Sequence, residues 1–265
     1  MTLQVQRHGE GPAVVVVPGA LRRATDYVEL GEALGALGWQ ACVVERRGRP
    51  GSPARLPGEG IERECDDLSR VCQEVAAVAT VGHSFGALIC LESAARGVID
   101  LPMALYEPGV SVGGSIPADW VDRYVELLGL GRRRTAFAHF VRHSTGSPPF
   151  VRHLPVWYLT AVLRVALRRE WPRLDTLLEV SGEEHRLVAA CDDRVSAYRT
   201  ISAPVLLLGG AKSPPALVRI PFAALEQHLP HVHSVVLPGL DHFAPDDKAP
   251  VVVAAEVDAF LRRVC

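Results

Sequence analysis

The sequence alternates short apolar runs, typical of buried strands, with segments whose apolar residues recur every three or four positions, typical of helices. Residues 13–17 form an uninterrupted apolar run, as expected of a parallel strand covered on both faces. Residues 30–37 show helical spacing, residues 39–44 are strand-like again, and residues 68–75 return to helical spacing. This repeated order predicts an α/β fold with a mostly parallel central sheet flanked by helices.

The pattern changes in the middle of the chain. Residues 101–106 predict another strand, but only helical patterns follow before residue 200; they cover residues 120–130, 135–143, 156–169 and 183–190. Strand patterns then resume over residues 203–210 and 234–237. Helical patterns cover residues 217–228 and, at the end of the chain, residues 253–264. We therefore expect a core of residues 1–113 and 200–265, with residues 114–199 inserted as a helical cap.

The segment Gly82-His83-Ser84-Phe85-Gly86 joins a predicted strand to a predicted helix. Small and β-branched residues over 75–81 precede it, and the apolar helix after it ends at Gly97. A strand that turns at once into a helix strains the residue at the apex, and glycines on both sides leave room for close packing. Ser84 is then exposed near the positive end of the helix dipole. The alternative is an ordinary glycine-rich turn in which the serine only caps the helix.

This strand, turn and helix resembles the nucleophile elbow of the α/β-hydrolase superfamily. The resemblance covers nearly the whole chain and is greatest to an actinobacterial group with a Tyr-Glu-Pro strand end and a Gly-Gly-x-x-Ser-Pro loop, here residues 106–108 and 209–214. It implies an α/β-hydrolase fold in which Ser84 is the nucleophile.

The resemblance also implies an oxyanion hole in the loop after the first buried strand. The backbone N–H of Ala20 or Leu21, together with that of Phe85, would bind the developing negative charge. Taken alone, Pro18-Gly19 after a strand indicates only a turn.

A serine hydroxyl needs a base to act as a nucleophile at neutral pH, and the base needs a carboxylate to orient it. Among ten histidines, His242 follows the last predicted strand, where the resemblance places the catalytic histidine. Relatives usually place the acid after the strand at residues 205–208, where this chain has no carboxylate. Some place it one strand earlier, which implies Glu107. The alternatives are a serine–histidine dyad, or a triad completed by Asp192 or Asp193 of the cap.

Other polar residues near these segments have simpler interpretations. His83 adjoins Ser84, but neighbouring side chains diverge at such a turn, so we expect it to pack in the core. His231 and His233 lack a third metal ligand nearby in the sequence, and we expect no metal site. The arginines of residues 45–52 are expected to be structural or solvated, with contact to substrate as the alternative.

Composition limits the classes of partner. The chain has 28 basic and 30 acidic residues, a net charge of −2, which favours neither nucleic acid nor an anionic membrane surface as partner. No stretch of 18 apolar residues and no apolar leader are present, so we expect a soluble, cytoplasmic protein without a membrane partner. The six cysteines form no C-x-x-C pair and are expected to be free thiols.

Aromatic residues are concentrated in the predicted cap. Nine of the chain's 16 aromatics fall in residues 114–199, which predicts that some of them line an apolar pocket for a hydrophobic small molecule. With Ser84 as nucleophile, the expected reaction is hydrolysis of an ester, lactone or thioester through an acyl-enzyme, without a metal or organic cofactor. The alternatives are acyl transfer, cyclisation or lyase chemistry at the same site, or a ligand-binding protein without activity.

Overall fold

The computed structural model describes residues 3–56 and 58–265. The predicted core range also includes residues 1, 2 and 57, which lie outside the described residues. Within the described part, seven strands form one sheet in the order β1-β3-β2-β4-β5-β6-β7. Their bounds are β1 Gln4–His8, β2 Ala13–Val17, β3 Gln40–Glu45, β4 Ala79–His83, β5 Met103–Tyr106, β6 Val205–Gly210 and β7 Val232–Leu237. Only β1 pairs antiparallel, with β3, so the predicted α/β fold with a mostly parallel sheet is confirmed.

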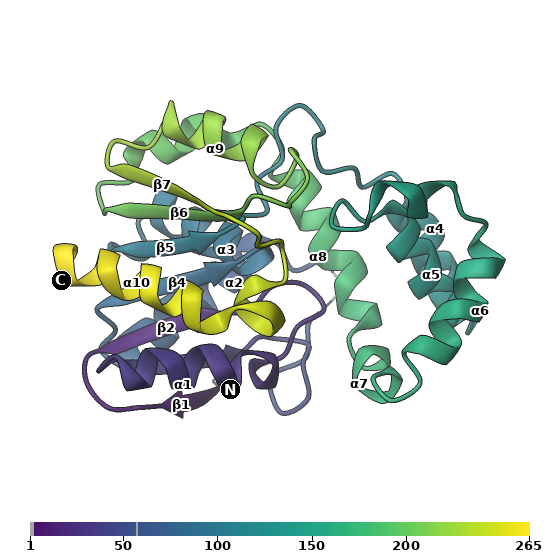
Figure 1. Cartoon of the computed structure of the whole chain (residues 1–265), viewed down its shortest axis with the longest axis horizontal. Helices are drawn as coiled ribbons and strands as arrows, with labels where there is room; N and C mark the ends of the chain where they lie inside the picture. The colour runs from purple at the N-terminus through teal and green to yellow at the C-terminus, as the bar shows by residue number, and fades with distance from the viewer. Residues whose placement is uncertain (1–2, 57) are drawn as a thin grey trace.

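Helices cover both faces of the sheet (Figure 1). One face packs against α1 and α10, and the other packs against α2, α3 and α9. Their bounds are α1 Val28–Ala36, α2 Ile61–Glu74, α3 Phe85–Ala95, α9 Arg219–Glu226 and α10 Pro250–Val264. Alternate residues of β2 supply the two cores: Val14 and Val16 face α1 and α10, while Val15 and Val17 face the other layer. The continuous apolar run is thus explained by burial on both faces.

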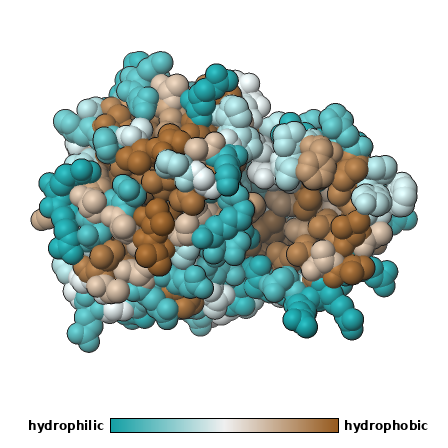
Figure 2. All heavy atoms as spheres, viewed as in Figure 1, coloured by the Kyte–Doolittle hydropathy of each residue, from teal (hydrophilic) through white to brown (hydrophobic). Residues whose placement is uncertain are grey.

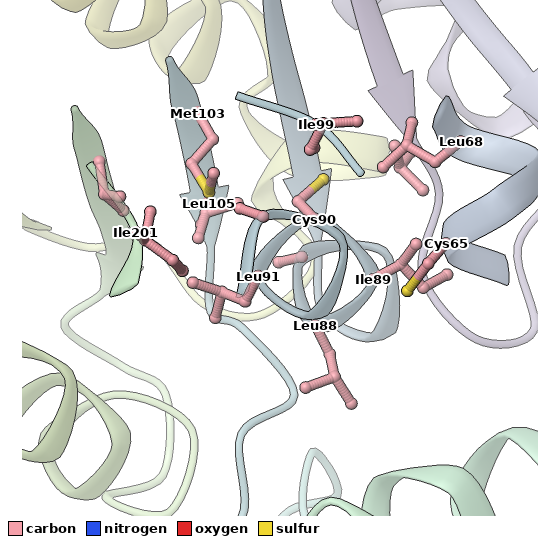
Figure 3. Packing of buried hydrophobic residues seen from close by; sticks show 14 of the residues in the cluster. Cys65, Leu68, Leu88, Ile89, Cys90, Leu91, Ile99, Met103, Leu105 and Ile201 are labelled. Atoms are coloured by element: carbon pink, nitrogen blue, oxygen red, sulfur yellow. The ribbon is translucent and has the colours of Figure 1, made fainter. Parts of the chain in front are cut away.

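The helix α3 is buried on every side. Figure 3 shows it nearly end-on, with Leu88, Ile89, Cys90 and Leu91 pointing in different directions around its axis. Each of these side chains is at most 1% exposed. Because α3 begins directly after Ser84, its close packing fixes the position of that residue relative to the sheet.

Between β5 and β6 the chain forms a group of helices that lies to one side of the sheet (Figure 1), here called the helical insert. It comprises α4 Val121–Gly129, α5 Arg133–His143, α6 Val156–Ala166, α7 Trp171–Asp175 and α8 Leu178–Ala190. The insert has its own apolar core, which includes Trp120, Tyr124 and Phe137. Apolar side chains also lie on its surface (Figure 2), and α6 contributes the exposed Trp157 and Val165.

Short helical turns complete the described chain: η1 Ala24–Tyr27, η2 Pro149–His153, η3 Arg194–Thr200 and η4 Ala244–Lys248. In residues 3–56 and 58–265, no helix has both the length and the apolar character needed to cross a membrane. All six cysteines are free thiols, and Cys265 is exposed.

The strand predicted over residues 75–81 begins later, at Ala79. The N–H of Val75 still donates to the carbonyl of Val71 in the last turn of α2, and Ala76 has a positive φ of 50°. The chain must reverse direction between α2 and β4, and residues 75–78 form that turn although their two valines favour strands. Local propensity is overridden here by the connection between two packed elements.

Candidate active site

Ser84 has a strained backbone between β4 and α3. Its φ is 54° and its ψ is −117°, a region that non-glycine residues rarely occupy. Two contacts from the end of β5 stabilise it: the Ser84 N–H donates to the Tyr106 carbonyl at 2.9 Å, and the Gly109 N–H donates to the Ser84 carbonyl at 3.0 Å. Ser84 is partly exposed although its neighbours are buried, so its side chain is the one presented to solvent at this turn.

The glycines on both sides of Ser84 are required by close packing. A Cβ atom on Gly82 would lie 2.5 Å from the Cα atom of Ala87. A Cβ atom on Gly86 would lie 2.1 Å from the carbonyl oxygen of Val17 in the neighbouring strand. Both neighbours are backbone atoms, so they cannot move aside as a flexible side chain can.

Glu107 follows β5 with a positive φ of 45° and a fully buried side chain. Its Oε2 lies 2.7 Å from Nδ1 of His242. Its Oε1 accepts hydrogen bonds from the Gly210 N–H at 2.8 Å and from the Ser213 hydroxyl at 2.6 Å. The last residue of β6 and the loop after it, which lacks a carboxylate, therefore each supply one donor that fixes the Glu107 carboxylate at the end of the neighbouring strand. In the sequence, this contact is indicated only by Ser213, a hydroxyl residue in the loop that would otherwise hold the acid.

His242 lies on the loop after β7 and lines the same pocket as Ser84. Because the Glu107 carboxylate accepts from Nδ1, the neutral imidazole carries its proton on Nδ1 and its lone pair on Nε2. No hydrogen bond joins the Ser84 hydroxyl to His242 among the described residues. Such bonds are often long in enzymes without substrate and shorten when substrate binds.

The two cap aspartates that sequence analysis left open lie elsewhere. Asp193 accepts a hydrogen bond from the Gly113 N–H at 2.7 Å, and Asp192 accepts from the Gly114 N–H at 3.0 Å. Both carboxylates fix the chain where it leaves β5 for the helical insert. The carboxylate in contact with His242 is that of Glu107.

His83 has more than the packing role expected from sequence. Its Nε2 donates to the backbone carbonyl of His242 at 2.9 Å, so its Nδ1 accepts from the Tyr27 hydroxyl at 2.6 Å. Tyr27 in turn accepts from the Gly19 N–H at 3.0 Å. Burial, followed by the effects of His242 and Arg22, lowers the pKa of His83 well below its ordinary value. This neutral chain of hydrogen bonds connects the histidine loop to the loop after β2.

Arg46 fixes the loop after β2. Its Nε donates to the Pro18 carbonyl at 2.8 Å and its terminal nitrogen donates to the Gly19 carbonyl at 2.8 Å. The Gly19 carbonyl and the Ala20 N–H belong to one planar trans peptide, so they point in opposite directions. Arg46 therefore directs the Ala20 N–H away from itself.

The backbone N–H groups of Ala20, Leu21 and Phe85 belong to residues that line the same pocket as Ser84. None of the three donates to an acceptor in residues 3–56 or 58–265. Leu21 has a positive φ of 55°, so this loop is also strained. Free N–H groups beside a serine are suited to binding a negatively charged oxygen.

The arginines between β3 and α2 are structural. Arg46 pairs with Glu184 of α8 at 2.8 Å, and the Arg49 guanidinium also donates to that carboxylate. Arg47 pairs with Asp67 of α2 at 2.7 Å. All three arginine side chains are at most 2% exposed. This buried network connects the helical insert to the sheet.

The pocket has a volume of about 340 Å³ and lies between the edge of the sheet and the helical insert. Its wall is mainly apolar and includes Ile116, Trp120, Phe137, Phe140 and Leu217. In the described part of the chain, no group of three or more His, Cys, Asp and Glu side chains is arranged to bind a metal ion.

The mostly parallel sheet with a strained serine between β4 and α3, and a histidine after β7, is the arrangement typical of α/β hydrolases. The sequence model of the alpha/beta hydrolase family matches residues 14–256, so the chain belongs to this family. A comparison with curated proteins finds no significant match.

Similar solved structures extend over almost the whole chain. An alpha/beta hydrolase from Sphaerobacter thermophilus DSM 20745 is 29% identical with a TM-score of 0.81, covering 98% of this chain and 96% of its own. A structure from a study of carboxylesterases of the thaumarchaeon Nitrososphaera gargenis is 17% identical, with a TM-score of 0.73 and coverage of 99% and 94%. Est816, described as an N-acyl homoserine lactone degrading enzyme, is 18% identical, with a TM-score of 0.68 and coverage of 99% and 96%. The last two likenesses concern the fold alone.

Proposed function

We propose that this α/β hydrolase is a serine hydrolase that cleaves an ester, lactone or thioester of a small to medium hydrophobic substrate. The observation that carries the proposal is the buried Glu107 carboxylate, 2.7 Å from Nδ1 of His242, with His242 and Ser84 in one pocket. Glu107 orients the imidazole and fixes its tautomer, so that Nε2 is available as a base.

In the first half of the reaction, Ser84 Oγ attacks the carbonyl carbon while His242 Nε2 takes the hydroxyl proton. The carbonyl π electrons move onto oxygen to give a tetrahedral oxyanion. When this collapses, the bond to the leaving group breaks and His242 gives its proton to the departing oxygen or sulfur. In the second half, His242 takes a proton from water, the water oxygen attacks the acyl-enzyme, and collapse returns the proton to Ser84.

The oxyanion hole in this proposal consists of the N–H groups of Phe85 and of Ala20 or Leu21. Free N–H groups at these three residues support it, as does the anchoring of the loop by Arg46. In serine hydrolases, loss of one oxyanion donor lowers kcat by about 10²- to 10³-fold.

We further propose that residues 114–199 act as a cap that completes an apolar pocket over Ser84. Aromatic residues of the insert in the pocket wall support this, because apolar lining is what binds a hydrophobic substrate. Two of the structural relatives, one from a study of carboxylesterases and one described as a lactone-degrading enzyme, are compatible with acyl substrates of this kind.

A fluorophosphonate probe tests the proposal, because it labels only an activated serine. We expect labelling at Ser84, located by peptide mass spectrometry, and its complete loss in Ser84→Ala. Ser147→Ala is the matched control, since Ser147 lines the same pocket and should leave labelling unchanged. In parallel, Ser84→Ala should lower kcat on p-nitrophenyl esters by up to about 10⁶-fold. Labelling that persists in Ser84→Ala would show the assignment wrong.

A further inference from the structure

Among the polar side chains of the pocket that take no part in the reaction described above, one lies between aromatic rings. His185, on α8, lines the pocket together with Ser84 and His242. Its ring packs edge-on against two aromatic rings of the helical insert, with centroids 5.0 Å from Trp120 and 5.3 Å from Phe140. His185 therefore contributes a hydrogen-bonding atom to an aromatic part of the pocket wall.

The hydrogen bonds of His185 identify which nitrogen is free. Nδ1 lies 2.7 Å from the carbonyl of Ser181, one helical turn earlier, and a carbonyl only accepts, so Nδ1 carries a proton. Burial lowers the pKa of His185, despite opposing effects of Ser181 and Glu184, so the ring is neutral at neutral pH. Nε2 is then a lone-pair acceptor. Among the described residues no donor contacts it.

Glu184, the preceding residue, adds a second observation. It also lines the pocket, and it is fully buried. Its Oε1 accepts from Arg46 and Arg49, whereas its Oε2 has no hydrogen-bond partner in residues 3–56 and 58–265. Burial would raise the pKa of Glu184, but the two arginines outweigh it and lower the value to about 2, so the group stays ionised. Each of the two pocket-lining residues His185 and Glu184 therefore keeps an acceptor atom that has no hydrogen-bond partner within the described part of the chain.

His185 is partly exposed, so water can satisfy Nε2 in the empty pocket. An apolar ligand that displaces this water leaves the acceptor unpaired, whereas a ligand with a donor replaces the lost hydrogen bond. We propose that His185 determines specificity by accepting a hydrogen bond, at Nε2, from a hydroxyl or amide N–H on the otherwise apolar part of the substrate. The preferred substrates are then hydroxyacyl or amide-bearing esters, lactones or thioesters rather than plain alkyl ones. The statement about substrates rests on the proposed function, whereas the hydrogen bond to His185 does not depend on it.

The test compares pairs of ligands that differ by one donor. Methyl ω-hydroxyalkanoates of increasing chain length are each paired with the ester in which a methyl group replaces the terminal hydroxyl. Binding is measured by calorimetry on Ser84→Ala protein, so no turnover is needed, and kcat and KM are measured for matching p-nitrophenyl esters. Each pair is measured with His185 present and with His185→Phe, which keeps an aromatic ring and removes both nitrogens.

For each pair we take the ratio of the affinity for the hydroxyl ligand to that for the methyl ligand. At one chain length or more, this ratio should be at least about fivefold higher in protein that has His185 than in His185→Phe. The same change should appear in KM, with kcat little altered. His185→Gln, which restores an acceptor oxygen, should recover part of the ratio. His228→Phe is the matched control, because His228 has the same Nδ1 bond to a carbonyl four residues earlier, at 2.7 Å, but lies outside the pocket.

Equal ratios with and without His185 at every chain length would overturn the inference. If Ser84 is labelled and esters are cleaved in that case, the proposed function stands and only the role of His185 fails. If the ratio depends on His185 but no serine is labelled, the binding contact stands and the proposed reaction fails. Circular dichroism of each variant shows whether the fold is kept. Partial recovery of the ratio in His185→Gln shows that the lost hydrogen-bond acceptor, and not a disturbed fold, causes the change.

Discussion

Replacing Glu107 by glutamine is the most informative change to this site, because the surrounding donors dictate how the new amide must lie. In the native protein, Oε1 of Glu107 accepts from the Gly210 N–H and the Ser213 hydroxyl, and Oε2 accepts from His242 Nδ1. In Glu107→Gln, the amide oxygen should take the Oε1 position, which leaves the NH₂ group facing His242. Nδ1 must then accept, so the proton moves to Nε2, which can no longer act as the base.

The size of the effect follows from the cost of the alternative orientation. Turning the amide over would restore the His242 tautomer but would leave the buried Gly210 N–H without an acceptor, at about 1–3 kcal/mol. Since about 1.4 kcal/mol corresponds to a factor of ten, this alone lowers activity by roughly 5- to 150-fold. The lost charge, which stabilises the imidazolium, adds to this. The equivalent change in a serine protease lowers kcat by about 10⁴-fold.

We therefore expect Glu107→Gln to lower kcat by about 10²- to 10⁴-fold with KM little changed. Steady-state kinetics on one p-nitrophenyl ester over a range of pH measures this, and circular dichroism checks the fold. Asp192→Asn and Asp193→Asn are the controls, since their carboxylates bind the Gly114 and Gly113 amides, and each should lose less than about tenfold. A Glu107→Gln enzyme with a rate within about tenfold of the native rate would refute the reasoning.

Two further predictions concern the connection to the helical insert and the pocket. Glu184→Gln should lower the free energy of unfolding by about 3–5 kcal/mol in urea titrations, because it removes the negative charge that the buried Arg46 and Arg49 share. Glu183→Gln, at the half-exposed pair with Arg186, should cost less than about 1 kcal/mol. The pKa of Glu184 is lowered from 4.5 to about 2, so the stability that its charge contributes is complete above about pH 4.5 and is lost as the pH falls towards 2. If the difference in unfolding free energy between native protein and Glu184→Gln does not shrink over this range, the assignment is wrong. Lengthening the acyl chain of p-nitrophenyl esters should raise kcat/KM above that of the acetate, because apolar burial supplies about 25 cal/mol per Å², and a flat or falling series would argue against an apolar pocket.

Local sequence pattern was enough to predict the elements and much of their order. Buried strands appear as unbroken apolar runs such as residues 13–17, and the covering helices appear as apolar residues at helical spacing, because these patterns follow from local geometry. The strand, tight turn and helix around Ser84 could be predicted for the same reason, since glycines mark the places where backbone must approach backbone. The predicted strand order and the family resemblance together placed Glu107 and His242 in loops that follow strands.

Which of these residues meet depends on the tertiary fold. Glu107 and His242 are 135 residues apart, as are Arg49 and Glu184, and no periodicity relates such pairs. Sequence left Asp192 and Asp193 open as partners of the histidine because side-chain reach depends on how the helical insert packs. It also missed the hydrogen-bond chain through His83, since a histidine in an apolar segment has the same local pattern whether it packs or bonds. Burial creates these contacts by removing water, so each polar group must find its partner in the folded chain.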